Sequence, residues 1–165
     1  MKMTDLFLDE LEREAVHCRR TLEQVPDGRA DWKPHDKSMP FGYLAQLVAT
    51  MPGWVTMTIK QDFLELNPGG GGKPLRTKQE LLHALDQGVA EARDALKTTT
   101  DDHLMKPWQL RVAGKVVTEE PRYVILRDAV FNHLAHHRGQ MTVYLRLLGA
   151  QVPAIYGPSA DEQRF

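Results

Sequence analysis

Hydrophobic residues recur every three or four positions along four stretches of the chain, which is the spacing of one face of an α-helix. In the first stretch, this face carries Leu8, Leu11, Ala15, Cys18 and Leu22. A Pro-Asp-Gly turn at residues 26–28 follows it. The pattern predicts an amphipathic helix that ends near this turn.

The second stretch combines an apolar face with a helix start signal. It begins at residues 38–40, Ser-Met-Pro, where serine suits the N-cap and proline the first turn. Its apolar face carries Leu44, Leu47, Val48 and Met51. A Pro-Gly pair at residues 52–53 interrupts this helix, and helical character resumes from Trp54 to Leu66.

The third and fourth stretches also have recognisable ends. The third begins at Thr77, and Glu80 three residues later completes a capping box. Its apolar face carries Leu81, Leu85, Val89, Ala92 and Leu96. The fourth is expected to run from Pro121 to Leu148, with Gly149 as its C-terminal cap.

Two connections between these helices have distinctive sequences. The Asn-Pro pair and four glycines at residues 67–72 predict a loop. This glycine run does not qualify as a phosphate-binding loop, because it follows a predicted helix and because Pro74 stands where Ser or Thr would hold magnesium. Residues 108–118 alternate in polarity around Ala113-Gly114, which predicts a small β-hairpin.

Four amphipathic helices of this length predict an all-α fold, an up-and-down four-helix bundle with the small hairpin before the last helix. The 165 residues fit one domain, residues 1–165.

Charge and cysteine content restrict the partners and the compartment. The 21 Lys and Arg against 22 Asp and Glu give a net charge of -1, so neither nucleic acid nor an anionic membrane is an expected partner. No segment approaches the about 18 apolar residues of a membrane span. With Cys18 alone, an internal disulfide is impossible. The opening MKMTDLFLDELERE lacks a signal-peptide pattern, and a cytoplasmic location is expected.

Three histidines stand close together in FNHLAHHRGQM, residues 131–141. Helical phase places His133 and His137 on the inner side, one turn apart, with His136 at the edge of this side. Arg138 is expected to point away, toward acids on the outer face. Two imidazoles on adjacent turns can bind one metal ion, but interior histidines satisfied by hydrogen bonds show the same spacing. Both interpretations stay open from the residues alone.

Two other candidate sites are weaker. The strings from Glu14 to His17 and from Glu80 to His83 have the ExxH spacing of di-iron bundles. Helical phase turns them toward solvent, with Glu14 at the margin. Cys18 lies in the apolar face of its helix, where a buried thiol is normally inert.

Several strings resemble the DinB (damage-inducible, YfiT-like) family and follow its order over most of the chain. They are HLAHHRGQ at 133–140, YLR at 144–146, VPAIYGPSADE at 152–162, DWKPH at 31–35, KSM at 37–39 and LAQLVATMPGW at 44–54. The resemblance implies a four-helix bundle, a homodimer and a divalent metal, such as nickel or zinc, held by three histidines. Relatives include thiol-dependent transferases and isomerases that use low-molecular-weight thiols.

The family pattern transfers to this chain at two metal ligands and fails at the third. His133 and His137 match two of the ligands, whereas Leu47 occupies the position of the first. Gln46 faces another side of the helix, His35 and His103 lie in expected loops, and Gln140 offers at most a weak oxygen ligand. We therefore expect a degenerate metal site.

Two functions follow from this site. In the first, the chain is a DinB-like protein of uncertain activity in which His133, His137 and Tyr144 form hydrogen bonds inside a small-molecule pocket. In the second, it is a divalent-metal-dependent thiol transferase or hydrolase. His136, nearer the rim, would then transfer a proton near neutral pH.

Overall fold

The computed structural model describes residues 2–66 and 75–163. The elements in chain order are α1 (Met3–Leu22), α2 (Phe41–Thr50), η1 (Met51–Gly53), α3 (Trp54–Lys60), β1 (Phe63–Leu66), α4 (Lys78–Thr98), α5 (Asp101–Leu104), β2 (Pro107–Val112), β3 (Lys115–Pro121), α6 (Arg122–Ile125), η2 (Leu126–Asn132) and α7 (His133–Leu147). The glycine-rich loop expected at residues 67–72 lies outside the described residues.

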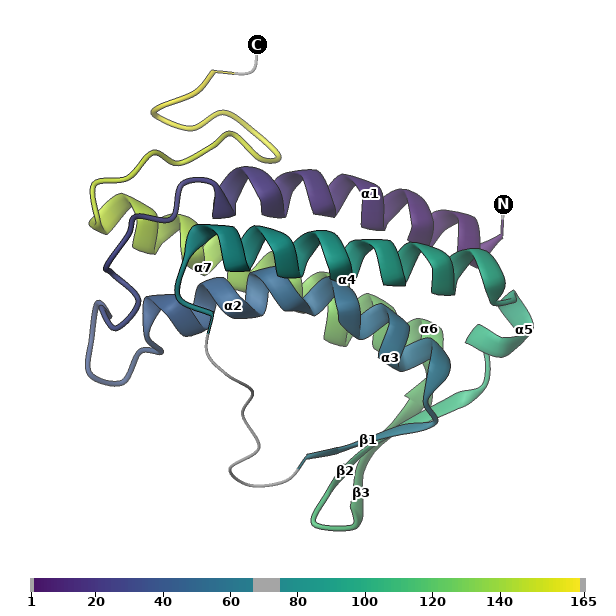
Figure 1. The fold of residues 1–165 in the computed structure, drawn as a ribbon. Coiled ribbons are helices and arrows are strands. Elements are labelled where there is room, and N and C mark those ends of the chain that lie inside the picture. Colours follow the sequence, from purple (N-terminus) through teal and green to yellow (C-terminus); the bar gives the residue numbers. More distant parts are fainter. Residues whose placement is uncertain (1, 67–74, 164–165) are drawn as a thin grey trace.

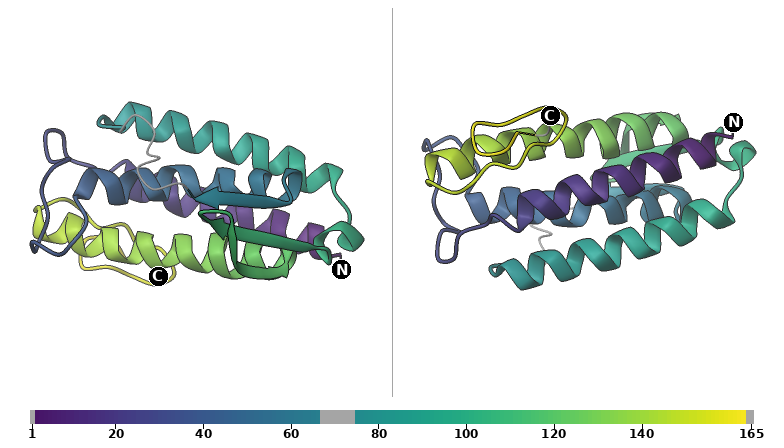
Figure 2. Two further views of the ribbon diagram at one scale, coloured as in Figure 1. Left: turned by 90° about the horizontal axis from the view of Figure 1, so that it is seen from below. Right: turned by 90° about the horizontal axis from the view of Figure 1, so that it is seen from above.

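The four helical stretches expected from the sequence are present, and they lie side by side (Figures 1 and 2). The second is divided into α2 and α3 by the short 3₁₀ turn η1, at the Pro-Gly pair. The strands gather on the side of the helices opposite α1 (Figure 1). No helix in the described ranges is long and apolar enough to cross a membrane.

The expected all-α four-helix-bundle class is wrong, because the fold also contains a three-stranded mixed sheet and is therefore α+β. β2 is the central strand, parallel to β1 and antiparallel to β3. The hairpin expected at residues 108–118 is confirmed as β2 and β3. Its turn, Ala113-Gly114, has positive φ angles of 49° and 75°, which suits the right-handed twist of a hairpin.

Two elements were not predicted from the sequence: the short helix α5, which contains His103 in place of the expected loop, and the strand β1. Residues 63–66, Phe-Leu-Glu-Leu, were expected to continue a helix, but α3 ends at Lys60 and these residues pair with residues 109–112. A short apolar run fits a helix and a strand equally well by periodicity. Pairing with a segment more than 40 residues away decides between them, and the local sequence does not contain that information.

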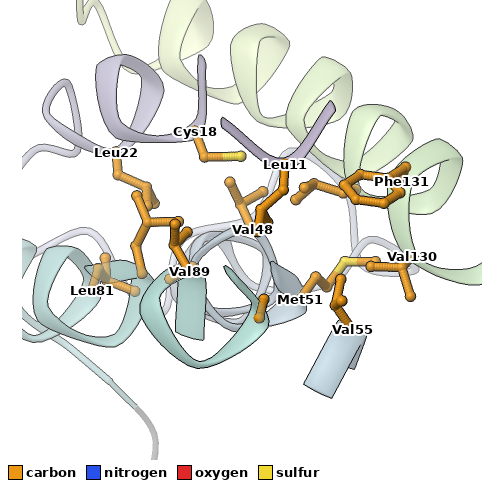
Figure 3. Packing of buried hydrophobic residues seen from close by; sticks show 14 of the residues in the cluster. Leu11, Cys18, Leu22, Val48, Met51, Val55, Leu81, Val89, Val130 and Phe131 are labelled. Carbon is orange, nitrogen blue, oxygen red and sulfur yellow. The ribbon is translucent and has the colours of Figure 1, made fainter. Parts of the chain in front are cut away.

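The core forms between the apolar faces of the helices (Figure 3). On α1, Leu11, Cys18 and Leu22 are buried as expected, while Leu8 and Ala15 are partly buried at the edge. On α4, all five residues of the predicted apolar face are buried. The Thr77–Glu80 capping box that starts this helix is also confirmed.

A close backbone contact fixes the position of the Pro-Gly-Trp segment. A Cβ atom added at Gly88 of α4 would lie 3.1 Å from the backbone nitrogen of Gly53 in η1. The two glycines therefore let α4 approach η1 closely. This contact holds the segment that carries Trp54, whose ring is part of the site described below.

Replacing Asp101 by Asn is expected to lower the melting temperature at pH 7. The Asp101 carboxylate accepts hydrogen bonds from the backbone nitrogens of Met3, at 3.0 Å, and Thr4, at 3.1 Å, and so caps the start of α1. These bonds lower the pKa of Asp101 from its ordinary value of 3.8. A carboxyl group whose pKa is lower in the folded than in the unfolded protein stabilises the folded state when it is ionised. The stabilisation by Asp101 is therefore present above pH 3.8, its ordinary pKa, and is lost as the pH falls through the folded-state pKa.

Thermal unfolding followed by circular dichroism between pH 7 and pH 3 checks this prediction, with the exposed neighbour Asp102→Asn as the control. The difference in melting temperature between wild type and Asp101→Asn should shrink on acidification. Equal melting temperatures for the two variants at pH 7 would contradict the capping role.

Candidate functional site

The three histidines cluster at the start of α7. The ring centroids of His133 and His137 are 4.4 Å apart, those of His136 and His137 are 5.2 Å apart, and those of His133 and His136 are 6.4 Å apart. His137 is 6 % exposed, His133 is partly buried and His136 is exposed. This order of burial agrees with the helical phase expected from the sequence.

The cluster directly follows a π-helical segment, η2. The expected continuous α-helix from Pro121 to Leu148 is therefore wrong over residues 126–132, where the turns are wider. π-helical turns are rare and are frequent near functional sites. At the other end, Gly149 with φ of 72° provides the C-terminal cap as expected, and the backbone nitrogen of Ala150 donates to the carbonyl of Leu145.

Gln140 orients the ring of His137. Its Oε1 lies 2.9 Å from His137 Nδ1, and because an amide oxygen only accepts, Nδ1 carries the proton. This leaves the lone pair of His137 on Nε2. Burial lowers the pKa of His137 and the neighbouring His133 and His136 act in the same direction, while the hydrogen bond that His137 donates to Gln140 opposes them. The His137 ring is therefore neutral at pH 7.

Aromatic contacts fix how α7 runs against α2 and α3. Trp54, at the start of α3, lies against His133 with ring centroids 6.0 Å apart. Phe41, at the start of α2, stacks on Tyr144 at 6.3 Å. The two helical stretches are therefore antiparallel, and Leu47, midway between Phe41 and Trp54, lies level with the middle of the segment from His133 to Tyr144.

Among the described residues, no side chain takes the place of the missing third ligand at Leu47. Gln46 Oε1 accepts from the backbone nitrogen of Leu75 at 2.9 Å. His35 Nδ1 accepts from the backbone of its own loop, and His103 Nε2 lies 2.8 Å from the carbonyl oxygen of Ile59. Within residues 2–66 and 75–163, no three His, Cys, Asp or Glu side chains are arranged to hold one metal ion. These donors do not fit a three-histidine site.

Tyr144 does not join the histidine cluster as the small-molecule interpretation expected. Its hydroxyl donates to the carbonyl oxygen of Met39 at 3.3 Å, and its ring packs between Trp32 and Phe41. Tyr144 therefore supports the connection before α2. The contacts within the cluster are those among the three imidazoles and the hydrogen bond between His137 and Gln140.

Arg138 is buried, so its expected position on the outer face is wrong. Its side chain is 2 % exposed and pairs with Glu14 of α1, whose side chain is 4 % exposed. It also donates to the hydroxyl of Tyr156, which in turn donates to Glu14 Oε1 at 2.6 Å. The prediction from helical phase considered only the side of α7 that faces α2. In the structure, α1 and the C-terminal segment cover a second side of α7, and Arg138 lies on that side (Figure 2).

The same network contains Cys18, whose thiol is buried as expected. Burial raises the pKa of Cys18 to about 11, although Arg138 lies within 3.5 Å of the sulfur and opposes the shift. Burial and the hydrogen bond to Glu14 raise the pKa of Tyr156 to about 12. Both groups are protonated at neutral pH. The network therefore has the chemistry of a structural connection between α1, α7 and the C-terminal segment.

Solved structures of low sequence identity share this fold. A DinB-like protein from Bacillus cereus superposes with a TM-score of 0.71 at 20 % identity, over 91 % of this chain and 95 % of its own. The DinB-like protein YjoA from Bacillus subtilis superposes with a TM-score of 0.68 at 16 % identity, over 96 % of this chain and 99 % of its own.

Sequence comparison identifies the family, which a shared fold at low sequence identity does not. The uncharacterized protein YrdA of Bacillus subtilis is 27 % identical over 158 residues, which span 96 % of this chain and 90 % of YrdA. The sequence model of the DinB family matches residues 2–164. On this match, which covers nearly the whole chain, the protein belongs to the DinB family.

Proposed function

We propose that this DinB family member has a degenerate metal site and acts as a small-molecule-binding protein whose working state needs no resident metal. The observation that carries the proposal is the position of Leu47. Leu47 lies level with the middle of the segment from His133 to Tyr144, and it occupies the position where the family resemblance implies a third imidazole. Catalytic zinc sites normally have three protein ligands, and here the donors supply two.

The surviving pair still supports weak binding of a divalent metal. The Nε2 lone pair of His137 is free of its Gln140 contact, and His133 is the adjacent ring. Metal-bound histidines usually have the second ring nitrogen hydrogen-bonded in this way. Affinity rises with the number of ligands and with their preorganisation, so two imidazoles bind nickel or zinc much less tightly than three.

The second candidate function is a divalent-metal-dependent thiol transferase or hydrolase. The exposed ring of His136, 5.2 Å from that of His137, favours it, because a solvent-facing imidazole can exchange protons with water. This function requires that the metal site be occupied in the cell. The homodimer and the low-molecular-weight thiol ligand stay predictions based on the family resemblance.

Nickel binding to the wild-type protein is expected to be weak and to disappear in His133→Ala. Removing one of two imidazoles leaves a single donor, which does not hold the ion. Isothermal titration calorimetry on protein without a histidine tag measures the effect. His83→Ala, which removes an exposed histidine from α4, is the matched control and should bind as wild type does.

Tight binding of one nickel per wild-type chain, lost in His133→Ala, would overturn the proposal and favour the metal-dependent enzyme. Binding of equal strength in wild type and His133→Ala would instead show that the histidine pair is not the site.

A further inference from the structure

A cavity of about 320 Å³ lies between α3, the three-stranded sheet and η2. Its walls are mainly apolar and include Met57 of α3, Leu64 of β1, Leu110 of β2 and Val130 of η2. Its volume is at the lower end of the roughly 300–1,000 Å³ typical of small-molecule sites. His133 lines one part of the cavity and connects it to the histidine cluster.

Two buried polar groups on this cavity lack hydrogen-bond partners. Thr58 is 0 % exposed and Trp108 is 4 % exposed, and both residues line the cavity. Thr58 Oγ1 and Trp108 Nε1 have no partner among the described residues. Native proteins satisfy the large majority of buried side-chain donors and acceptors, so two unpartnered groups beside one cavity need an explanation. A bound molecule that completes these hydrogen bonds provides it.

The lining also determines the charge of such a molecule. His133 is the only titratable residue among the described residues that line the cavity, which includes no Asp, Glu, Lys or Arg. A charged ligand would lose its hydration without gaining an opposite charge. Trp108 Nε1 can only donate, so the ligand must offer an acceptor.

We propose that this cavity binds an uncharged, largely apolar small molecule whose carbonyl or ether oxygen accepts a hydrogen bond from Trp108 Nε1, with Thr58 as a second polar contact. The proposal rests on the proposed function to the extent that binding needs no metal. It names the ligand class and places the ligand between the sheet and the helices. The sheet that distinguishes this fold from a plain helical bundle thereby forms part of the binding site.

A matched pair of probes tests the proposal. Acetophenone carries a carbonyl oxygen, and ethylbenzene has nearly the same shape without an acceptor. Both are titrated in EDTA-containing buffer while the indole N–H resonances of the three tryptophans are followed by NMR. The spectrum of Trp108→Phe identifies the resonance of Trp108.

Acetophenone should bind saturably, move the Trp108 indole resonance downfield, and bind about two- to tenfold more tightly than ethylbenzene, the value of one net hydrogen bond. This preference should fall in Trp108→Phe. Thr58→Val, which removes the hydroxyl at nearly constant volume, should lower it as well. Thr58→Val thus keeps the test valid if Trp108→Phe does not fold.

Filling the cavity gives an independent control. Ala129 lines the cavity yet is exposed, so Ala129→Trp should block both probes without disturbing the core. Leu147→Trp adds the same side chain at an exposed position on α7 and should bind both probes as wild type does.

Equal affinity for the two probes, binding that persists in Ala129→Trp, or no saturable binding of acetophenone would each overturn the cavity proposal. These outcomes leave the nickel titrations unchanged. Conversely, binding of acetophenone that appears only when EDTA is replaced by nickel would contradict the metal-free working state.

Discussion

Replacing Arg138 by Met is expected to destabilise the protein by about 3–5 kcal/mol, because it leaves the Glu14 carboxylate buried without its counter-charge. The side chains of Arg138 and Glu14 are at most 4 % exposed, so water cannot replace the guanidinium as the partner of Glu14. The hydroxyl of Tyr156 also loses the guanidinium that donates to it. The C-terminal segment should therefore detach from α1 and α7 more readily than in wild type.

Urea unfolding followed by circular dichroism measures this effect. Arg146→Met is the matched control, because the pair between Arg146 and Asp161 has side chains 47 % and 28 % exposed and should contribute about 0–1 kcal/mol. Replacing both partners, Glu14→Leu with Arg138→Met, should recover much of the loss, since no unpaired charge then remains. If Arg138→Met costs no more than Arg146→Met, the buried pair does not hold α1 and α7 together.

Replacing Leu47 by His is expected to raise the affinity for nickel or zinc by at least about 100-fold, since losing even a partner of a metal ligand costs about 10–100-fold. The antiparallel packing of α2 on α7 places residue 47 level with the middle of the segment from His133 to Tyr144, within about one turn of α7 from His137. Leu47 is only partly buried, so a histidine of similar length fits at modest cost in stability.

Gln46→His is the control for this substitution. It adds the same side chain one residue earlier, where the wild-type Gln46 points toward Leu75 rather than toward the histidines. Its affinity for metal should stay near that of wild type. An equal gain in both variants would mean that any added histidine on α2 binds metal, and that the position of Leu47 has no special role.

The sequence predicted the helices well because their signals are local. The capping box at Thr77 and Glu80 and the glycine cap at Gly149 depend on residues within one or two turns. β1 was missed because its pairing partner, residues 109–112, is distant along the chain. Because of this sheet, the fold is α+β and not the all-α class expected from the helices.

The candidate site could be predicted in part for the same reason. The spacing of His133 and His137 and the substitution at Leu47 are visible in the sequence, and burial follows helical phase for all three histidines. The prediction for Arg138 failed because helical phase alone does not show that a helix is covered on a second side. The second covered side is made in part by Tyr156, which accepts from Arg138 and donates to Glu14. The cavity was not visible, because separate segments of the chain form its walls.

A zinc titration of wild type and Leu47→His, in competition with a chromophoric chelator and on protein without a histidine tag, tests the central claim most directly. Wild type is expected to fail in competition with the chelator, whereas Leu47→His is expected to take up one zinc ion per chain. Tight, stoichiometric binding of zinc by wild type, not strengthened in Leu47→His, would contradict the account and show that the metal site of this DinB family protein is complete without a third histidine.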